Sequence, residues 1–180
     1  MITGNTASGT FYVFNKKEHS TPIVFIHGVG LTYEIWQPQL DFFKNYSNLS
    51  YDILGHGKSS LTKKNINFDD FSLQLIELID KLKIEKIHLV GFSIGSLIAR
   101  NFATRYSERL QSLILLGSIY KRSEQQQKTV NERFEQAKKE LKLSSQALKR
   151  WFSNKYLENN PVTYEKISSI LSANNMANFL

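Results

Sequence analysis

The sequence predicts an α/β fold, in which a mostly parallel sheet is sandwiched between helices and a purely helical segment follows. Short, continuously apolar runs alternate with stretches of helical apolar spacing over residues 10–116. Such runs are typical of parallel strands that are buried on both faces. After Gly117 the apolar runs stop and only helical spacing remains. We therefore expect an α/β core over residues 1–119 and a helical part over residues 120–180.

The core elements follow from these patterns in order. Strands are expected at residues 10–14, 22–26, 49–53, 86–92 and 110–116, and helices at 33–46, 68–82 and 94–106. The run PIVFI at 22–26 is apolar throughout, so both of its faces should be buried. The helix at 68–82 carries Asp69 and Asp70 in its first turn, where negative charge is favourable beside the positive end of the helix dipole. The strand at 86–92 is expected to be central in the sheet.

Three helices are expected in the second part, at residues 123–141, 145–156 and 161–179. A Ser-x-x-Gln capping box opens the first of them. Asn160 as the cap and Pro161 at the first position open the last. No strand pattern interrupts these helices, so they form an appendage to the core.

Composition limits the classes of function. With 180 residues and 41% hydrophobic composition, the chain can form one domain with a substantial core. The net charge of +7 comes from scattered lysine pairs, without the interleaved aromatics that stack on bases, so no nucleic-acid partner is expected. The absence of cysteine excludes disulfides, thiolate metal sites and a cysteine nucleophile. We expect neither a metal nor a cofactor.

No apolar run approaches the roughly 18 residues of a membrane span. The first twenty residues lack the charged and then apolar layout of a signal peptide. The sequence therefore predicts a cytoplasmic protein without a membrane span.

The stretch GFSIG places Ser93 between Gly91 and Gly95, at the junction of a predicted strand and a predicted helix. In this context a serine sits on a turn so tight that its backbone is strained, and the glycines let the strand and helix pass closely. The helix N-terminus beside Ser93 favours developing negative charge. We interpret Ser93 as a nucleophile.

A second glycine turn, His27-Gly28-Val29-Gly30, ends the PIVFI strand. Acyl transfer needs two N–H donors aimed at the oxyanion, and a turn after a neighbouring strand can supply one of them. We assign the N–H groups of Ile94 and Val29 to this role. The alternative is that these glycines only make turns.

Taken together, the motifs resemble those of the α/β-hydrolase superfamily, of the serine-nucleophile type with a lid. HGVG followed by Trp36 resembles the oxyanion loop, YDILGHGKS the loop after the fourth strand, and GFSIG the nucleophile elbow. LQSLILLG matches the sixth strand, and the helices from Ser123 onward resemble the lid. The resemblance implies esterase, lipase, lactonase, C–C bond hydrolase or cofactor-free perhydrolase chemistry. A serine at position 93 argues against the haloalkane dehalogenases and epoxide hydrolases, which have an aspartate there.

GHGKS has a rival interpretation as a phosphate-binding P-loop. That loop needs a glycine five residues before Gly57 and a helix directly after the serine. Position 52 is aspartate, and SSLTKKNIN does not resemble a helix start. We therefore interpret Asp52 and Ser59 as residues that brace the loop.

The partners of the serine are the main departure from the family. Its triad runs in the order serine, acid, histidine, yet no aspartate and no histidine follow Ser93. The acids that do follow are glutamates, such as Glu108 and those of the appended helices, where a solvated role is expected. The family would continue with two more strands that bear the acid and the histidine.

The upstream histidines are poor substitutes. His88 precedes the serine by five strand residues, about 16 Å. His19 lies in a polar loop, and His27 matches a structural histidine of the family. His56 remains as the only other histidine on the carboxyl side of the sheet, and we do not expect it to be the base. We expect a C-terminally truncated fragment of a serine hydrolase that is inactive alone. The alternatives are a ligand-binding pseudo-hydrolase or inactive remnant, and an enzyme completed by a second chain.

The resemblance also implies a lid over Ser93. We expect Phe92, Trp151 and Phe152 to contact substrate, with Phe134 and Phe179 on the apolar faces of the lid. Aromatic residues at helical spacing can equally be plain packing. The expected substrate is a small-molecule ester or lactone with a small or medium apolar acyl group, and the oligomeric state is left open.

Overall fold

The computed structural model describes residues 1–61, 63–140 and 146–173. The chain forms two compact units, Met1–Ser118 and Ile119–Leu180. Each unit is described by itself.

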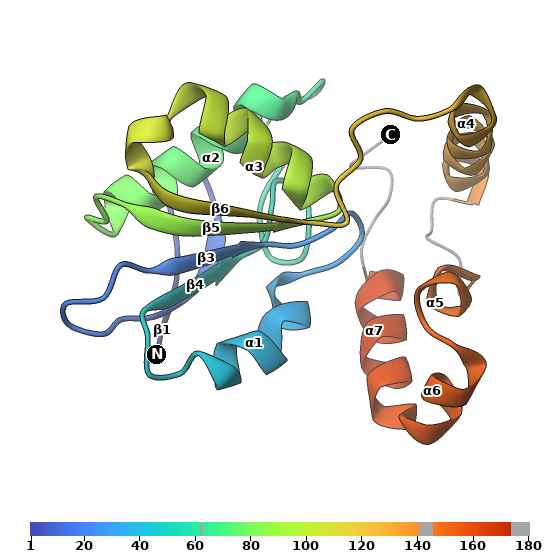
Figure 1. Cartoon of the computed structure of the whole chain (residues 1–180), viewed down its shortest axis with the longest axis horizontal. Helices are drawn as coiled ribbons and strands as arrows, with labels where there is room; N and C mark the ends of the chain where they lie inside the picture. The colour runs from blue at the N-terminus through green and yellow to red at the C-terminus, as the bar shows by residue number, and fades with distance from the viewer. Residues whose placement is uncertain (62, 141–145, 174–180) are drawn as a thin grey trace. The chain divides into compact units, whose positions relative to one another are not determined.

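The first unit is built on a six-stranded sheet (Figure 1). Its strands are β1 (Ile2–Asn5), β2 (Phe11–Asn15), β3 (Ile23–Ile26), β4 (Asn48–Tyr51), β5 (Ile87–Phe92) and β6 (Leu110–Leu116). They lie in the order β1-β2-β4-β3-β5-β6. Strands β4, β3, β5 and β6 are parallel, whereas β1 and β2 form an antiparallel extension. The predicted mostly parallel sheet is thus confirmed.

The prediction that the strand over 86–92 is central is wrong. β5 pairs with β3 on one side and with β6 on the other, and β6 is the last strand of the sheet. The middle of the sheet is formed by β4 and β3, because two antiparallel strands extend it beyond β4.

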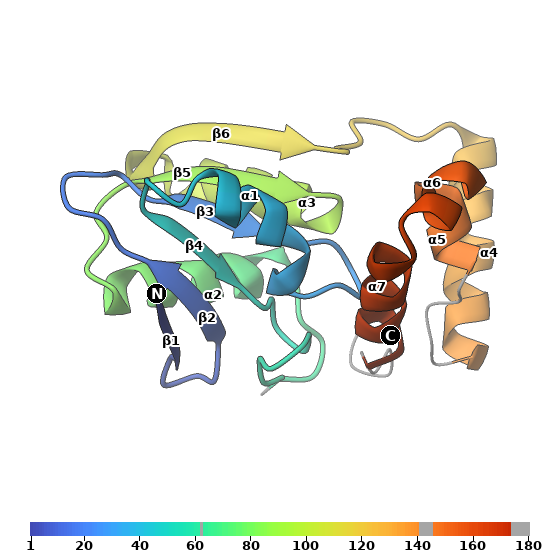
Figure 2. The ribbon, with the colours of Figure 1, turned by 90° about the horizontal axis from the view of Figure 1, so that it is seen from below.

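Helices cover both faces of this sheet (Figure 2). Helices α2 (Phe68–Lys81) and α3 (Ile94–Arg105) lie on one face, and α1 (Gln37–Phe42) lies on the other. A capping box between Asn67 and Asp70 starts α2, which satisfies two backbone N–H groups that the helix itself leaves unpaired. The larger core cluster lies between the sheet and α2 and α3, and a smaller one, which includes Phe25, Trp36 and Val90, lies on the α1 face.

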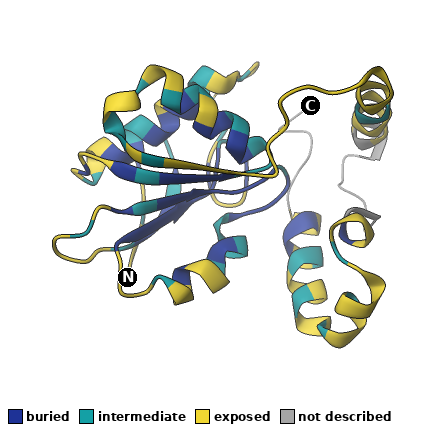
Figure 3. Ribbon diagram, in the orientation of Figure 1, coloured by how far each residue is buried: buried dark blue, intermediate teal, exposed yellow. Residues whose placement is uncertain are grey.

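Burial follows the layers (Figure 3). Strands β3, β4 and β5 are mostly buried, as their apolar sequences predict, whereas most of β6 is exposed. β6 is the edge strand of the sheet, with β5 as its one neighbouring strand.

Two elements of the first unit differ from the prediction. The helix expected at 33–46 is a 3-10 turn, η1 (Tyr33–Trp36), that continues into α1 and ends at Phe42. Strand β1 is not predicted at all, because ITGN contains a single apolar residue. Its pairing with β2, from Ile2 opposite Phe14 to Asn5 opposite Phe11, forms the strand.

The second unit is helical, with α4 (Glu124–Glu140), α5 (Gln146–Trp151), α6 (Asn154–Asn159) and α7 (Pro161–Ala173). The single helix expected at 145–156 is wrong, because α5 ends at Trp151 and α6 begins at Asn154. Ser153 caps α6 by accepting a hydrogen bond from the Tyr156 N–H at 3.2 Å. Phe134 and Trp151 are 43% and 42% exposed. Phe179 lies outside the described residues, and a lid over Ser93 stays a prediction.

None of the helices described here has both the length and the apolar character needed to cross a membrane.

Candidate active site

Ser93 occupies a strained turn between β5 and α3. Its backbone has φ 56° and ψ −118°, a left-handed conformation that side chains other than glycine rarely adopt. Its N–H donates to the carbonyl of Leu116 at 2.9 Å. Its own carbonyl accepts from the N–H and the Oγ of Ser96, at 2.9 and 2.6 Å. The predicted strain at Ser93 is confirmed, and its role as a nucleophile stays a prediction.

The two flanking glycines allow close backbone contacts. A Cβ on Gly91 would lie 2.2 Å from the carbonyl oxygen of Gly95. A Cβ on Gly95 would lie 2.5 Å from the carbonyl oxygen of Ile26 and 2.7 Å from that of His27. Both distances are far below van der Waals contact, so only glycine fits at either position. The start of α3 therefore touches the ends of both β5 and β3.

The predicted oxyanion loop lies directly beside this turn. Gly28 accepts a hydrogen bond from the Leu31 N–H at 3.2 Å, and Gly30 has a φ of 71°. A Cβ on Gly28 would lie 3.3 Å from the ring of Phe92, the residue before Ser93. The structure thus brings the HGVG turn and the serine turn together at the carboxyl edge of the sheet. The assignment of the Val29 and Ile94 N–H groups to an oxyanion stays a prediction.

His27 joins the loops that follow β3 and β4. The side chain is fully buried, its Nδ1 lies 2.8 Å from the Gly28 carbonyl, and its Nε2 accepts from the Ile53 N–H at 3.1 Å. Because Nε2 accepts, the ring is neutral with its proton on Nδ1. Burial, and to a smaller extent the nearby His56, lower the pKa of His27 to about 3, whereas the hydrogen bond to the Gly28 carbonyl acts in the opposite direction. His27 is a structural link in this chain.

Asp52 organises the loop after β4 from within. Its two carboxylate oxygens accept from the N–H groups of Tyr33 and Lys58, each at 2.8 Å. A Cβ on Gly57 would lie 2.3 Å from Oδ2, so the carboxylate fills the turn. The Ser59 hydroxyl donates to the Asp52 carbonyl at 2.6 Å. These contacts confirm that Asp52 and Ser59 brace the loop.

Gln74 is a positioning residue that the sequence analysis overlooked. It lies on the buried side of α2, where its Nε2 donates to the Thr10 hydroxyl at 3.1 Å and to the Asp52 carbonyl at 3.0 Å. Its Oε1 accepts from the Leu54 N–H at 3.0 Å. The available signal is a polar residue between Phe71, Leu75 and Leu78 on an otherwise apolar helical face.

The contacts of the histidines are with groups other than the Ser93 side chain wherever the structure gives them. His56 is 1% exposed, and its Nδ1 lies 3.0 Å from the Leu54 carbonyl. His88 pairs with the Ser112 hydroxyl at 2.8 Å, and His19 lies in the loop before β3 at the opposite edge of the sheet. Within residues 1–61, 63–140 and 146–173, no group of three or more histidine, aspartate or glutamate side chains could hold a metal ion.

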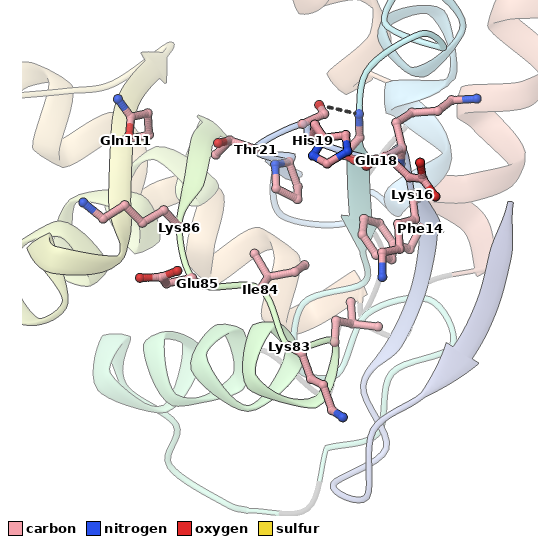
Figure 4. A pocket seen from close by; sticks show the side chains of 15 residues that line it. Phe14, Lys16, Glu18, His19, Thr21, Lys83, Ile84, Glu85, Lys86 and Gln111 are labelled. Carbon is pink, nitrogen blue, oxygen red and sulfur yellow. Dashed lines mark hydrogen bonds between the residues drawn. The ribbon is translucent and has the colours of Figure 1, made fainter.

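A basic pocket of about 480 Å³ lies at that opposite edge (Figure 4). It is lined by Phe14 of β2, Gln111 of β6 and the loops that precede β3, β4 and β5. The charged lining residues include Lys16, Glu18, Lys83, Glu85 and Lys86. Acidic and basic side chains are mixed around it, and none of the residues predicted for the active site lines it. It is separate from the serine turn.

The buried ionisable groups of these loops predict an acid-sensitive fold. Burial lowers the pKa of His56 to about 4 and raises that of Asp52 to about 6. Below pH 6.5 the unfolded chain takes up protons on His27 and His56, whereas the folded chain does not until the pH is much lower. These two histidines therefore lower the free energy of unfolding as the pH falls below 6.5. Asp52 has the opposite effect, because the folded chain keeps its carboxyl protonated up to about pH 6. Asp52 therefore lowers the free energy of unfolding as the pH rises from about 4 to 6. Two groups outweigh one, and urea unfolding should show lower stability at pH 5 than at pH 7.5.

The expected slope is about 1.4 kcal/mol per pH unit for each net proton taken up on unfolding. His56→Gln should make this slope smaller, because one of the two buried histidines is then removed. Equal unfolding free energies of the native chain at pH 7.5 and pH 5 would contradict the conclusion that His27 and His56 are buried in their neutral forms.

Comparison with known proteins gives one consistent family. Residues 21–164 match the family model of the alpha/beta hydrolase fold. The chain is 31% identical over 171 residues to (E)-2-((N-methylformamido)methylene)succinate hydrolase of Acinetobacter baylyi, and 26% identical over 172 residues to 3-oxoadipate enol-lactonase 2 of the same organism. These matches cover 94% and 95% of this chain but only 64% of each relative.

A solved structure shares the fold. The enol-lactonase from Burkholderia xenovorans LB400 superposes with a TM-score of 0.78 at 22% identity, covering 99% of this chain and 70% of that one. With the serine turn between β5 and α3 and the match over residues 21–164, the chain belongs to the α/β-hydrolase fold family.

Proposed function

We propose that the chain is the nucleophile-bearing part of a serine hydrolase that acts on a small-molecule carboxylic ester or lactone. Ser93 is the nucleophile, and the N–H groups of Ile94 and Val29 bind the oxyanion. The proton acceptor and its acid come from outside these 180 residues.

The backbone conformation of Ser93 carries this proposal. A left-handed φ at a residue other than glycine costs about 1–3 kcal/mol and persists only where surrounding contacts enforce it. Here β6 holds the N–H of Ser93, Ser96 holds its carbonyl, and Gly91 and Gly95 permit the close packing. The result is a half-buried serine at the start of a twelve-residue helix. This is the strand-turn-helix setting in which Gly-x-Ser-x-Gly has a catalytic mechanism.

In the proposed reaction this chain supplies the nucleophile and the oxyanion donors, and the base comes from outside it. The Ser93 oxygen attacks the carbonyl carbon of the ester while its proton passes to a base, and the oxyanion accepts hydrogen bonds from the two N–H groups. The alcohol then leaves and an acyl-serine remains until water releases the acid. The histidines of this chain do not supply the base, since two are buried and two belong to other parts of the sheet.

The relatives support the substrate class. Two of them are a hydrolase of a substituted succinate and a lactonase of 3-oxoadipate enol-lactone, and both names describe small molecules. The chain itself has no helix, among those described, that could span a membrane. A ligand-binding protein without catalysis is the competing class.

Replacing the absent base tests the proposal. We expect that imidazole at increasing concentration, with p-nitrophenyl acetate as the substrate, will acetylate Ser93 of the native chain, as seen by peptide mass spectrometry. The rate above that of the Ser93→Ala variant should saturate with ester, because the oxyanion donors and binding remain. Ser107→Ala, at an exposed serine, is the matched control. Acetylation confined to lysines, or equal rates in the native and Ser93→Ala chains, would favour the non-catalytic class.

A further inference from the structure

The basic pocket at the amino edge of the sheet takes no part in the chemistry proposed for Ser93 (Figure 4). Strands β3 and β5 begin beside it, at Ile23 and Ile87, and they end at the HGVG turn and the serine turn. The pocket and the candidate active site therefore lie at opposite ends of the same two strands. Sites for small molecules typically have volumes of about 300–1,000 Å³, and the volume of about 480 Å³ falls in this range.

Lysines predominate among the charged residues that line the pocket. The basic residues are Lys16, Lys17, Lys83 and Lys86, and the acidic residues are Glu18 and Glu85. In the part of the chain that the structure describes, none of these six side chains belongs to an ion pair. Four ammonium groups against two carboxylates leave an excess of two positive charges, with His19 counted as neutral. The pocket therefore has a positive potential that attracts an anion.

The loop before β3 is held in place by the buried residue Ser47. The Lys17 N–H donates to the Ser47 hydroxyl at 2.8 Å, and this hydroxyl donates to the Lys17 carbonyl at 2.9 Å. The Ser47 N–H donates to the Ser20 hydroxyl at 3.0 Å. The loop is therefore anchored to the start of β4 on both sides of His19, so this wall of the pocket has a fixed backbone.

Arg109 holds the loop on the other side of the pocket. Its guanidinium donates to the carbonyls of Ile84 and Glu85 at 2.7 and 2.8 Å, and it forms an ion pair with Asp80 at 2.7 Å. These bonds fix the backbone between Lys83 and Lys86. Both loops that carry the lysines are thus in place without a ligand.

Lys83 occupies a position where glycine is the usual residue. It follows Leu82, the C-cap of α2, and has a φ of 55°. Its N–H donates to the Asp80 carbonyl at 3.0 Å, and the Ile84 N–H donates to the Ile79 carbonyl at 2.9 Å. In this type of helix end the residue at positive φ is most often glycine, because a Cβ is unfavourable there. A side chain that is kept despite such strain is typical of functional positions.

We propose that this pocket binds a small phosphate monoester. The phosphate group lies among the lysines, and the remainder of the ligand contacts the apolar part of the lining, which includes Phe14, Pro22 and Ile84. A phosphate monoester carries about 1.5 to 2 negative charges at pH 7, which matches the excess of two positive charges.

The type of cation favours a phosphate over a carboxylate. No arginine is among the described residues that line the pocket. Lysine binds phosphate as a compact point charge, whereas the planar, bidentate recognition of a carboxylate uses arginine. A triphosphate would bring more negative charge than the lining balances.

Titration of the 180-residue chain with phenyl phosphate tests the proposal. At pH 7.5 and low ionic strength, we expect saturable shifts of the backbone amide NMR signals of residues 16–21 and 82–86. Added salt should weaken binding, because the charges of exposed lysines are screened. Phenyl sulfate has the same ring but a single negative charge, and it should bind about fivefold more weakly. Inorganic phosphate, which has no apolar part, should also bind about fivefold more weakly.

Lys83→Gly separates the role of this side chain in binding from its role in the fold. Glycine accepts the left-handed backbone, so the variant should not have a lower free energy of unfolding. It should nevertheless bind phenyl phosphate about threefold more weakly, because one exposed charge is lost. Lys64→Gln, at an exposed lysine outside the lining, is the matched control and should leave binding unchanged. Ser93→Ala should also bind phenyl phosphate as the native chain does.

Four results would overturn the proposal. They are amide shifts spread over the basic surface or gathered at the serine turn, equal binding by the Lys83→Gly and native chains, equal binding of phenyl sulfate, and equal binding of inorganic phosphate, which would identify free phosphate as the ligand. The proposed function fails separately. A chain that binds phenyl phosphate at this pocket but shows no acetylation of Ser93 with imidazole would leave the pocket assignment intact and contradict the proposed function alone.

Discussion

The Gly91→Ala variant is expected to lose at least about 4 kcal/mol of unfolding free energy. The added Cβ would lie 2.2 Å from the carbonyl oxygen of Gly95 and 2.8 Å from the Cα of Ser96. Both contacts are backbone atoms of a helix start, so neither can rotate away as a side chain could. Core substitutions that force backbone apart are among the largest single-residue effects. Urea unfolding of the purified variant gives the value, and accumulation as insoluble protein is the more extreme form of the same result.

Gly117→Ala is the matched control for this variant. Gly117 has a left-handed φ of 61°, whereas Gly91 has none, and the nearest atom to the Cβ position of Gly117 is 3.6 Å away. The substitution should therefore cost only the backbone term of about 1–2 kcal/mol. Equal losses in the two variants would mean that the close contact between β5 and α3 at residue 91 costs no more than a left-handed backbone at residue 117, which would contradict the prediction.

The second large effect concerns catalysis by the chain alone. Without added imidazole, the 180-residue chain is expected to hydrolyse p-nitrophenyl acetate no faster than its Ser93→Ala variant. Serine hydrolases that lose all three triad members lose about 10⁶ in kcat and keep about 10³ to 10⁴ over water from the oxyanion site and binding. That remainder does not depend on the serine. Initial rates over a range of ester concentrations, at a pH above 7 where the fold is most stable, make the comparison.

Ser93-dependent turnover by the unaided chain would reverse this expectation. A base inside the chain would then be at work, and His56 would be the first to replace. Its burial and its low pKa mean that the loop after β4 would have to open during turnover.

In the first unit, strands with apolar sequences are predicted correctly from the sequence. A strand that forms only because it pairs with a neighbour is not predicted. Residues 110–116 form the expected strand, because LQSLILL has no competing helical pattern. The segment ITGN forms β1 because it pairs with β2, and no local sequence pattern indicates this pairing. The position of β5 in the sheet is likewise a property of strand order, and strand order is not written in any one segment.

The candidate site follows the same rule. The strain at Ser93 is predictable because the spacing of Gly91 and Gly95 between a strand and a helix allows only a tight turn. The links through His27, Asp52 and Gln74 join segments up to 64 residues apart, and spacing carries no signal for them. Polar residues on apolar faces are the one local indication that such links exist.

The tautomer of His27 has a consequence for how the molecule responds to acid. Nε2 accepts from the Ile53 N–H while Nδ1 faces the Gly28 carbonyl. A proton added to Nε2 would turn the acceptor into a donor, so two N–H groups would confront each other across the loops. Protonation of His27 would therefore weaken the link between the loops that follow β3 and β4. Because the backbone of His27 packs against Gly95 at the start of α3, we expect low pH to loosen the loops beside the serine turn.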